Sequence, residues 1–409
     1  MILTGLRLRA ILDSRARLTV EAEVRLDGEH AGRGSSARAI APGRREPRRA
    51  DHTRPGPIPP PPSLAGLVGT RIDGQRALDT DLDRWCRAGG LGADVAVAVS
   101  LAHARARAAR DRRPLALLLA ELAGTVPRLP RPLVNVFSGG IHTPESPDGF
   151  QQVMALPDTG SLVTDIEVAC QVFAAAERLC DRRFGRCPLS DSSGLLVPVD
   201  SAAQLELLAT AIDDAGHRPV CGLGVDVAAE HLRDQDGRYR FGGAILPVDD
   251  FAARLGALAG DAPLRYLEDP FDPADEPAWR AMRRSLPGVA LVGDDLFASS
   301  AARLDPTLAS GVLLKPTQAG TVTALLDTAA AARSVGLLVV LSHRSGETDD
   351  TAVSDLAVAL GADLIKMGGP RRGDRLANYN QLLRLADALP GRAPAPPSPI
   401  RDPKEFLCR

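Results

Sequence analysis

The chain has 409 residues, of which 44% are hydrophobic, 24% are charged and 3% are aromatic, and its formal net charge is −2. This length exceeds what one hydrophobic core usually holds, so we expect two domains. A nearly neutral chain with few aromatic side chains argues against nucleic acid as a partner. No apolar run approaches the roughly 20 residues of a membrane span, so we expect no membrane partner either.

The spacing of the cysteines and the composition of residues 1–15 indicate the cellular compartment of the protein. The six cysteines form neither a Cys-x-x-Cys pair nor metal-finger spacing, which favours free thiols in a reducing compartment over a disulfide framework. Residues 1–15 interrupt their apolar side chains with arginines, which is typical of neither a signal peptide nor a membrane anchor. We therefore expect a cytoplasmic protein.

The first third of the chain predicts a small α+β capping domain, which we place at residues 1–128. Residues 17–28 alternate apolar and charged side chains and end in Asp-Gly, as a strand does before a hairpin turn. Residues 44–62 are rich in Arg and Pro, so we expect a surface loop or a disordered segment with no regular ladder or helix. Residues 92–124 are a stretch of Ala, Leu and Arg broken by Pro114, which predicts two helices that cover the opening sheet.

The rest of the chain predicts an α/β barrel, which we place at residues 129–409. Short apolar runs alternate with longer helical patterns, as in βα units around a parallel sheet. The runs are LVNVF, LRYLED, VALVGDD, GVLLK, LLVVLSH and DLIK. Nearly every run ends in a polar or ionisable residue, and a (β/α)₈ barrel builds its active site at such strand ends. No Gly-rich phosphate loop follows the first βα turn, which argues against an open doubly wound sheet.

Three acidic residues, Asp226, Glu268 and Asp294, each close an apolar run. Three carboxylates brought together would repel one another unless a hard cation such as Mg²⁺, which takes oxygen ligands, lay between them. Basic and polar residues close the later runs, namely Lys315, the triplet His343-Arg344-Ser345 and Lys366. Each of these residues alone would more often be a surface charge or a core histidine. Together, at strand ends, they predict a metal enzyme with a basic pocket.

Several motifs resemble those of the enolase family over most of the chain. In the first domain they are AILDSRARLTVEAEV and LGADVAVAVSLAHARA, and in the second LEDPF, VGDDLF, LLKPTQAGT, LSHRSGETDDT and IKMGGPRRGDRLANYNQLLR. The last two motifs are long and specific. The resemblance implies an N-terminal α+β domain followed by a (β/α)₈ barrel of enolase type, a Mg²⁺-dependent lyase, and a homodimer or higher homo-oligomer.

The resemblance also implies roles for residues at the strand ends. Asp226, Glu268 and Asp294 match the Mg²⁺ ligands of the family. Lys315 matches the general base, and Lys366 matches the lysine that neutralises the substrate carboxylate. These roles agree with the chemistry, because removing a proton next to a carboxylate creates an enolate whose negative charge needs cations already in place.

Further residues complete the predicted site. Arg344 and Ser345 match the phosphate-binding pair, and His343 precedes them in the same motif. His142 matches the histidine of the family's mobile loop. We expect His343 and His142 to be catalytic, and Gln152 to belong to the substrate-binding residues.

At three places the sequence departs from the family pattern, and there the roles implied by the resemblance do not carry over directly. The lid motif appears as residues 38–42, so a serine that would bind a second Mg²⁺ falls on Ala41. A catalytic glutamate becomes Gln152, and the glutamate that protonates the departing hydroxyl falls on Ser192 or Ser193. General acid catalysis contributes about 10² to 10⁴-fold. We therefore expect ordinary dehydration of 2-phosphoglycerate to be slow or absent, unless another acid substitutes.

The candidates for a substitute acid are Asp191, Glu145 and Asp148. We expect an enzyme that forms an enolate from a phosphoglycerate-like or phosphonate-like carboxylic acid and eliminates to an enolpyruvate-type product, as in enolase relatives of secondary metabolism such as carboxyphosphonoenolpyruvate synthesis. Two alternatives stay open. One is a conventional phosphopyruvate hydratase with a substitute acid, and the other is a non-catalytic enolase-like binding protein.

Arginines near the lid motif allow two interpretations. Arg38, Arg44 and Arg45 are expected to form a solvated basic loop, and the alternative is that a guanidinium replaces the second Mg²⁺. The dimer implied by the resemblance pairs through the N-terminal domain, where Ala16-Arg17-Leu18 replaces the family's Gly-Asn-Pro.

Overall fold

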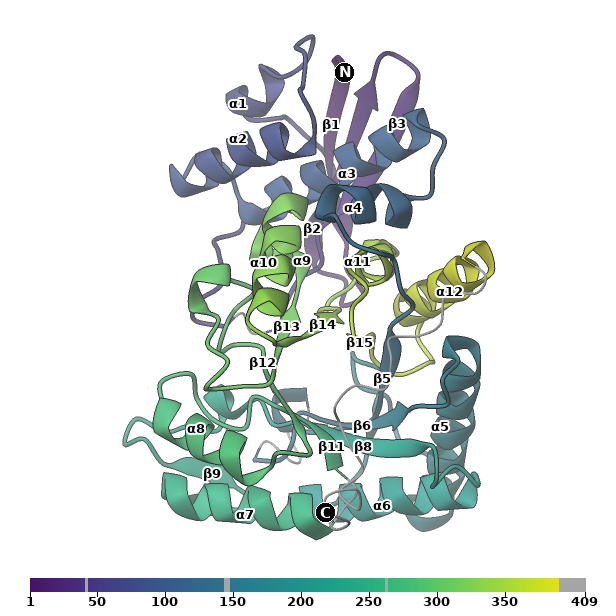
Figure 1. Ribbon diagram of the computed structural model, residues 1–409, viewed down its shortest axis with the longest axis vertical. Coiled ribbons are helices and arrows are strands. Elements are labelled where there is room, and N and C mark those ends of the chain that lie inside the picture. The colour runs from purple at the N-terminus through teal and green to yellow at the C-terminus, as the bar shows by residue number, and fades with distance from the viewer. Residues whose placement is uncertain (41–42, 143–147, 262–263, 390–409) are drawn as a thin grey trace.

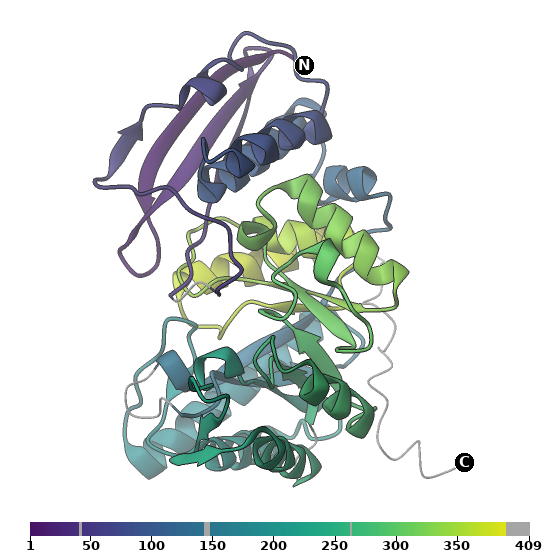
Figure 2. The same cartoon turned by 90° about the vertical axis from the view of Figure 1, so that its left-hand side faces the viewer.

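The computed structural model describes residues 1–40, 43–142, 148–261 and 264–389. Figures 1 and 2 show an antiparallel sheet with helices at one end of the molecule and a closed barrel at the other. The predicted architecture, an N-terminal α+β region followed by an α/β barrel, is confirmed.

The N-terminal sheet is antiparallel, with strand order β3-β2-β1-β4. Its strands are β1 (Leu3–Leu12), β2 (Leu18–Leu26), β3 (His30–Ser35) and β4 (Gly56–Ile58). The predicted hairpin turn joins β2 to β3, with φ angles of 52° at Asp27 and 84° at Gly28. The prediction that the Arg/Pro segment forms no ladder is wrong at β4. This strand lies at the sheet edge beside β1, where proline is tolerated because one side of the strand needs no ladder.

Four helices belong to this end of the molecule: α1 (Pro62–Ala65), α2 (Gln75–Arg87), α3 (Ala93–Arg110) and α4 (Leu115–Ala123). Helix α3 lies against the sheet (Figure 2) and approaches β3 so closely that a Cβ added to Gly32 would lie 2.2 Å from the carbonyl oxygen of Ala102. Pro114 precedes α4, as predicted, because proline is tolerated at a helix start. The expectation that both helices cover the sheet is wrong for α4, which packs mainly against helix α11 of the barrel.

Eight strands close the barrel, because β15 pairs with β5. They are β5 (Arg131–Ser138), β6 (Gln152–Pro157), β8 (Cys221–Asp226), β11 (Leu264–Glu268), β12 (Ala290–Gly293), β13 (Gly311–Leu314), β14 (Leu338–Ser342) and β15 (Leu364–Lys366). The barrel helices are α5 (Leu162–Phe184), α6 (Ser201–Asp214), α7 (Val248–Asp261), α8 (Glu276–Ser285), α9 (Pro316–Ala319), α10 (Val322–Ser334), α11 (Ala352–Leu360) and α12 (Gly373–Ala388). Short strands β7 (Leu195–Leu196), β9 (Tyr239–Phe241) and β10 (Ala244–Leu246) lie in connections.

The second barrel strand, β6, runs antiparallel to both of its neighbours, so the expectation of a wholly parallel sheet is wrong there. A parallel neighbour usually needs a crossover through an α-helix. The described residues between β5 and β6 form only a 3₁₀ turn, Gly140–His142, and two α-helices, α5 and α6, come after β6. The reversal places the first residue of β6, Gln152, at the rim where the other strands end. There it pairs with Ser138 of β5 and Asp226 of β8.

Apolar side chains fill the barrel and hold its strand ends in place. The inner cluster includes Leu133, Met154, Tyr266, Val292, Leu313, Val340 and Leu364. A larger cluster packs the helices around the outside of the strands. Within the described ranges, no helix has the length and apolar character needed to cross a membrane. Cys408 lies outside the described residues. The described cysteines are free thiols, as expected: Cys86, Cys170, Cys180, Cys187 and Cys221.

Candidate active site

A pocket lies at the rim formed by the carboxyl ends of the parallel barrel strands, and we call it the rim pocket. Most of the predicted site residues line it: Gln152, Asp226, Asp294, Lys315, His343, Arg344, Ser345 and Lys366. Glu268 lies directly behind them, in contact with Lys366. The side chain of His142 lies outside the described part of the chain, so its predicted role stays a prediction.

Lys366 joins two of the predicted metal ligands. Its Nζ lies 2.7 Å from the Asp226 carboxylate and 2.8 Å from the Glu268 carboxylate, and all three side chains are buried. Asp226 and Glu268 are register neighbours on β8 and β11. Burial raises the pKa of Glu268 to about 7, with Asp226 adding to the rise and Lys366 opposing it. Burial disfavours the Lys366 ammonium, but the attraction of Asp226 and Glu268 outweighs it and raises the lysine pKa, so this amine stays charged.

Lys315 pairs in the same way with Asp294, the first residue after β12. Gln318 Nε2 donates a second hydrogen bond to this carboxylate, at 3.2 Å. Burial alone would raise the pKa of Asp294, but the neighbouring ammonium groups, Lys315 first, lower it below its usual value. The two lysines, at the ends of β13 and β15, therefore each neutralise carboxylates of the predicted metal site.

A second group of acidic residues overlaps this site. One carboxylate oxygen from each of Asp269, Asp294 and Asp295 lies within 4.8 Å of the others. Asp269 accepts hydrogen bonds from the backbone N–H groups of Asp294, at 2.9 Å, and Asp295, at 2.8 Å. Burial and the neighbouring carboxylates raise the pKa of Asp269 well above its usual value and that of Asp295 to about 8. Sequence analysis missed Asp269 and Asp295, although each directly follows a predicted ligand.

The donor chemistry of the rim pocket fits a hard divalent cation. The predicted ligands Asp226, Glu268 and Asp294 stand on or just after three adjacent strands and offer only carboxylate oxygens, which are the ligands that Mg²⁺ takes in proteins. Only Asp294 belongs both to this predicted set and to the compact acidic group with Asp269 and Asp295.

His343 is held by a buried arginine that sequence analysis did not single out. Arg375, on α12, donates to His343 Nδ1 and to the Arg344 carbonyl oxygen, at 2.7 Å from the latter. Because Nδ1 accepts a hydrogen bond, the ring proton sits on Nε2. Burial, Arg375 and Lys366 lower the pKa of His343 well below its usual value, so the ring is neutral at physiological pH.

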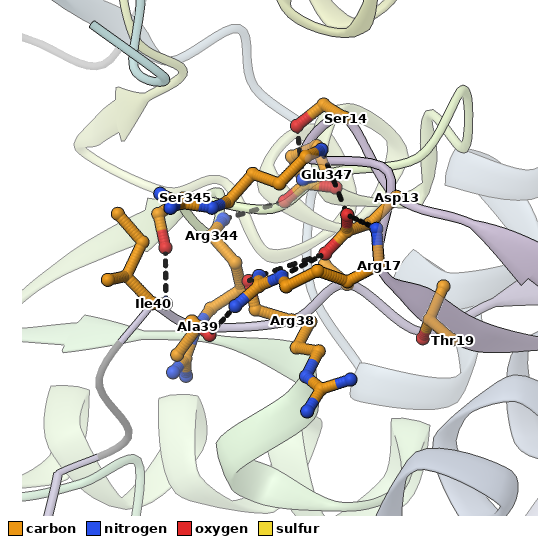
Figure 3. Close-up of polar contacts among 12 residues, drawn as sticks. Asp13, Ser14, Arg17, Thr19, Arg38, Ala39, Ile40, Arg344, Ser345 and Glu347 are labelled. Carbon is orange, nitrogen blue, oxygen red and sulfur yellow. Dashed lines mark hydrogen bonds and ion pairs between the residues drawn. The ribbon is translucent and has the colours of Figure 1, made fainter. Parts of the chain in front are cut away.

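Arg344 and Ser345 contact a segment of the N-terminal region, residues 38–40 and 43–50, which we call the strap. Arg344 Nη2 donates to the Glu46 carboxylate at 2.6 Å, and Ser345 Oγ accepts from the backbone N–H of Ile40 at 2.7 Å. Figure 3 shows the second contact, together with Arg17, which donates to the Ala39 carbonyl oxygen at 2.9 Å. The strap thus closes one side of the rim pocket.

Arg44 and Arg45 of the strap are exposed, as expected for a solvated basic loop, but they also contact the barrel. Arg44 forms ion pairs with Glu230 and Asp272, and Arg45 donates to the Leu296 carbonyl oxygen at 2.8 Å, so both bind the barrel. Neither these arginines nor Arg38 line the rim pocket, and no described contact supports the alternative in which a guanidinium replaces a second Mg²⁺. Ala41 lies outside the described residues.

Gln152 and Ser192, which stand where glutamates were expected from the resemblance, are neutral, and each has one polar atom without a partner in the described part of the chain. Gln152 and Ser192 both line the rim pocket and are buried, and among the described residues neither Gln152 Oε1 nor Ser192 Oγ has a hydrogen-bond partner. Ser193 points elsewhere, because its Oγ accepts from the backbone N–H of Arg372 at 3.1 Å. Of the two serines that the sequence left open, Ser192 is therefore the one in the pocket.

The two described candidates for a substitute acid, Asp191 and Asp148, do not line the rim pocket. Asp191 is paired with Arg15 at the surface, and Asp148 lines a separate cavity. Glu145 lies outside the described residues. The pocket lining also includes Ala39 and Ile40 of the lid motif. Sequence analysis did not single out three further lining residues, for which it offered no strand-end signal: Glu46, Gln151 and His231.

A barrel with carboxylates and lysines at the carboxyl ends of its strands defines an α/β-barrel protein with an enzyme-like site. A family model described as "Enolase, C-terminal TIM barrel domain" matches residues 127–395, which is more than half of the chain. The protein therefore belongs to the enolase family.

Proposed function

We propose that the protein is a Mg²⁺-dependent lyase acting on a small carboxylic acid that carries a phosphate or phosphonate group. It removes the proton next to the carboxylate and eliminates a substituent from the adjacent β-carbon, which gives an enolpyruvate-type product. The observation that carries this proposal is the meeting of Lys315, Lys366 and the strand-end carboxylates in one buried pocket of an enolase-family barrel.

Each residue has a role in this reaction. Lys315 is the base that takes the α-proton, and Lys366 neutralises the carboxylate on which negative charge develops. Mg²⁺ held by Asp226, Glu268 and Asp294 would supply further positive charge beside that carboxylate when bound. The neutral His343 ring offers its Nε2–H as a hydrogen-bond donor.

The anionic group of the substrate is assigned to Arg344 and Ser345. A guanidinium has five N–H donors, and Glu46 accepts from Nη2 while Thr317 lies 3.4 Å from Nη1, so donors remain for a phosphate or phosphonate. The strap lies against this side of the pocket through its contacts with the barrel. We further propose a cytoplasmic homo-oligomer whose reaction belongs to secondary metabolism, such as carboxyphosphonoenolpyruvate synthesis.

Exchange of the substrate α-proton in deuterated water, followed by NMR, tests the proposal without requiring elimination. We expect exchange with 2-phosphoglycerate or its phosphonate analogue in Mg²⁺ and none in EDTA. Lys315→Ala should slow exchange at least about 10²-fold, because it removes the base. Arg76→Ala is the control, since Arg76 pairs with Asp327 at the surface.

The outcomes separate the open alternatives. Binding of these acids without Mg²⁺-dependent exchange would leave the non-catalytic alternative and overturn the proposed lyase. Formation of phosphoenolpyruvate from 2-phosphoglycerate as fast as exchange would instead identify a conventional hydratase.

A further inference from the structure

One wall of the rim pocket offers two hydrogen-bonding groups that the protein itself does not use. Gln152 is 4% exposed and Ser192 is 1% exposed, and both line the pocket. Gln152 Oε1 and Ser192 Oγ have no partner within the described part of the chain. Leaving a buried polar group unpaired costs about 1–3 kcal/mol, so such groups are expected to meet a ligand or a water.

The hydroxyl of Ser192 is held in place by its backbone. The Ser192 carbonyl oxygen accepts from the Gly369 N–H at 2.8 Å and from Asn135 Nδ2 at 3.4 Å. The next residue, Ser193, adopts a left-handed φ of 61° and is fixed through its own hydroxyl. A Cβ at Gly369 would lie 2.4 Å from the Ser193 carbonyl oxygen, so the loop and the Gly369 backbone are in close contact. The backbone of Ser192 is therefore fixed at the pocket wall before any ligand arrives.

Gln152 is positioned by strand pairing. It opens β6 and pairs in register with Asp226 of β8, so its amide stands beside the lysine–carboxylate centre. The terminal amide can present either its oxygen or its N–H₂ group to a ligand by rotating about its last torsion.

This wall differs in charge from the rest of the pocket. Gln152 and Ser192 are neutral, and His343 accepts a hydrogen bond from Arg375 at Nδ1 and carries no positive charge. The charged groups, Lys315 and Lys366 with their carboxylates, are elsewhere in the lining. A hydroxyl and an amide are far too weakly acidic to hand a proton to departing hydroxide.

We propose that Gln152 and Ser192 form a leaving-group subsite, which binds the substituent on the substrate β-carbon by hydrogen bonds alone and selects a substituent that departs as a weakly basic anion. This inference rests on the proposed lyase. Lys315 takes the α-proton, the electron pair of the C–H bond becomes the new C=C bond, and the bond to the leaving group breaks. The leaving group keeps that bond's electron pair, and Ser192 O–H and Gln152 N–H donate to it.

Two substrates of nearly equal size test the subsite: 2-phosphoglycerate and its analogue with fluorine in place of the β-hydroxyl. Both give phosphoenolpyruvate, but fluoride leaves without a proton whereas hydroxide does not. We expect both substrates to exchange their α-proton at similar rates. Phosphoenolpyruvate should form at least about 10²-fold faster from the fluoro compound, which is the lower end of what a general acid contributes.

Variants then assign the selectivity to the two residues. Ser192→Ala should slow elimination of fluoride more than it slows α-proton exchange, because the lost hydrogen bond acts on the leaving group after the base has acted. Ser334→Ala is the control, since Ser334 is exposed on α10 away from the pocket, and it should leave both rates unchanged. The double variant Gln152→Glu with Ser192→Glu should raise phosphoenolpyruvate formation from 2-phosphoglycerate and reduce the preference for fluorine.

The results distinguish failure of the subsite from failure of the lyase. Equal phosphoenolpyruvate formation from both substrates overturns the subsite, and so does unchanged fluoride elimination in Ser192→Ala, which would mean that water alone meets these groups. Absence of exchange with both substrates overturns the proposed lyase, and the subsite with it. If the double variant does not fold, Ser192→Ala still decides.

Discussion

The lysine that bridges two buried carboxylates makes a strong prediction about stability. Lys366 lies within 2.8 Å of Asp226 and Glu268, and its side chain is only 4% exposed. Lys366→Met has a similar length and removes the charge, which leaves two carboxylates facing each other inside the barrel. We expect this variant to be markedly less stable than the wild type in EDTA at pH 8.

The expected loss follows from the burial of the pair. Removing one partner of a buried ion pair costs about 3–5 kcal/mol, and two unit charges about 4 Å apart repel by about 4 kcal/mol at an effective dielectric constant of 20. This is a large part of the roughly 5–15 kcal/mol that stabilises a typical protein. The matched control is Lys315→Met, which we expect to cost less, because it unpairs a single carboxylate, Asp294, that keeps the Gln318 amide as a donor.

The pH dependence has a definite sign. The pKa of Glu268 is about 7 in the folded protein against an ordinary 4.5, so this group's stability contribution is fully present below pH 4.5 and is lost as pH rises through 7. Without Lys366 the folded pKa rises further, because the ammonium opposes the rise in the wild type. The loss of stability in Lys366→Met should therefore be largest at pH 8 and become smaller towards pH 5, where Glu268 takes up a proton.

Urea unfolding measures the free energy of unfolding of the wild type and the variants, in EDTA and in Mg²⁺. The signal is the fluorescence of the buried Trp279 in a Trp85→Phe background. Mg²⁺ should stabilise Lys366→Met more than the wild type, since a ligand that binds the folded state stabilises it. A deficit below about 1 kcal/mol, the range of an exposed ion pair, would refute the reasoning, as would a deficit equal to that of Lys315→Met or independent of pH.

Two further predictions concern the turn after β14 and the strap. Burial raises the pKa of Glu347 to about 7 from 4.5, so its contribution to stability is lost as pH rises from 4.5 through 7. Urea titrations should show Glu347→Gln more stable relative to the wild type at pH 8 than at pH 5, by about 3 kcal/mol, and a constant difference would contradict this. Arg17→Met should weaken binding of inorganic phosphate measured by calorimetry, because Arg17 holds the strap beside Ser345. Unchanged phosphate affinity would show that the strap does not need Arg17.

The barrel could be predicted because its signals are local. Each predicted run, such as those at β13 and β14, is a short apolar segment that is buried on both faces, and each ends in a polar residue at the rim. The direction of β6 could not be predicted, because the apolar pattern of a buried strand is the same in both directions. The direction became visible only in the strand pairing, which is antiparallel on both sides of β6.

The strap shows why part of the site was beyond the sequence. Arg44 binds Glu230 and Asp272, and Glu46 binds Arg344, so each partner is far away along the chain. Composition alone describes an Arg- and Pro-rich segment as solvated, since no local pattern reveals distant carboxylates. Arg375 is a similar case, because a buried arginine on α12 has the same sequence signature as an exposed one.

The reversal of β6 links the fold to the proposed chemistry. In a parallel strand, the first residue lies at the end of the barrel opposite the active site. Gln152 is the first residue of β6, and only because this strand runs backwards does its amide stand beside Asp226 at the rim. The leaving-group subsite therefore depends on two independent features, the direction of one strand and the fixed turn that holds Ser192. A substitution that alters either feature should change which group departs while the base, on β13's side of the barrel, continues to exchange the α-proton.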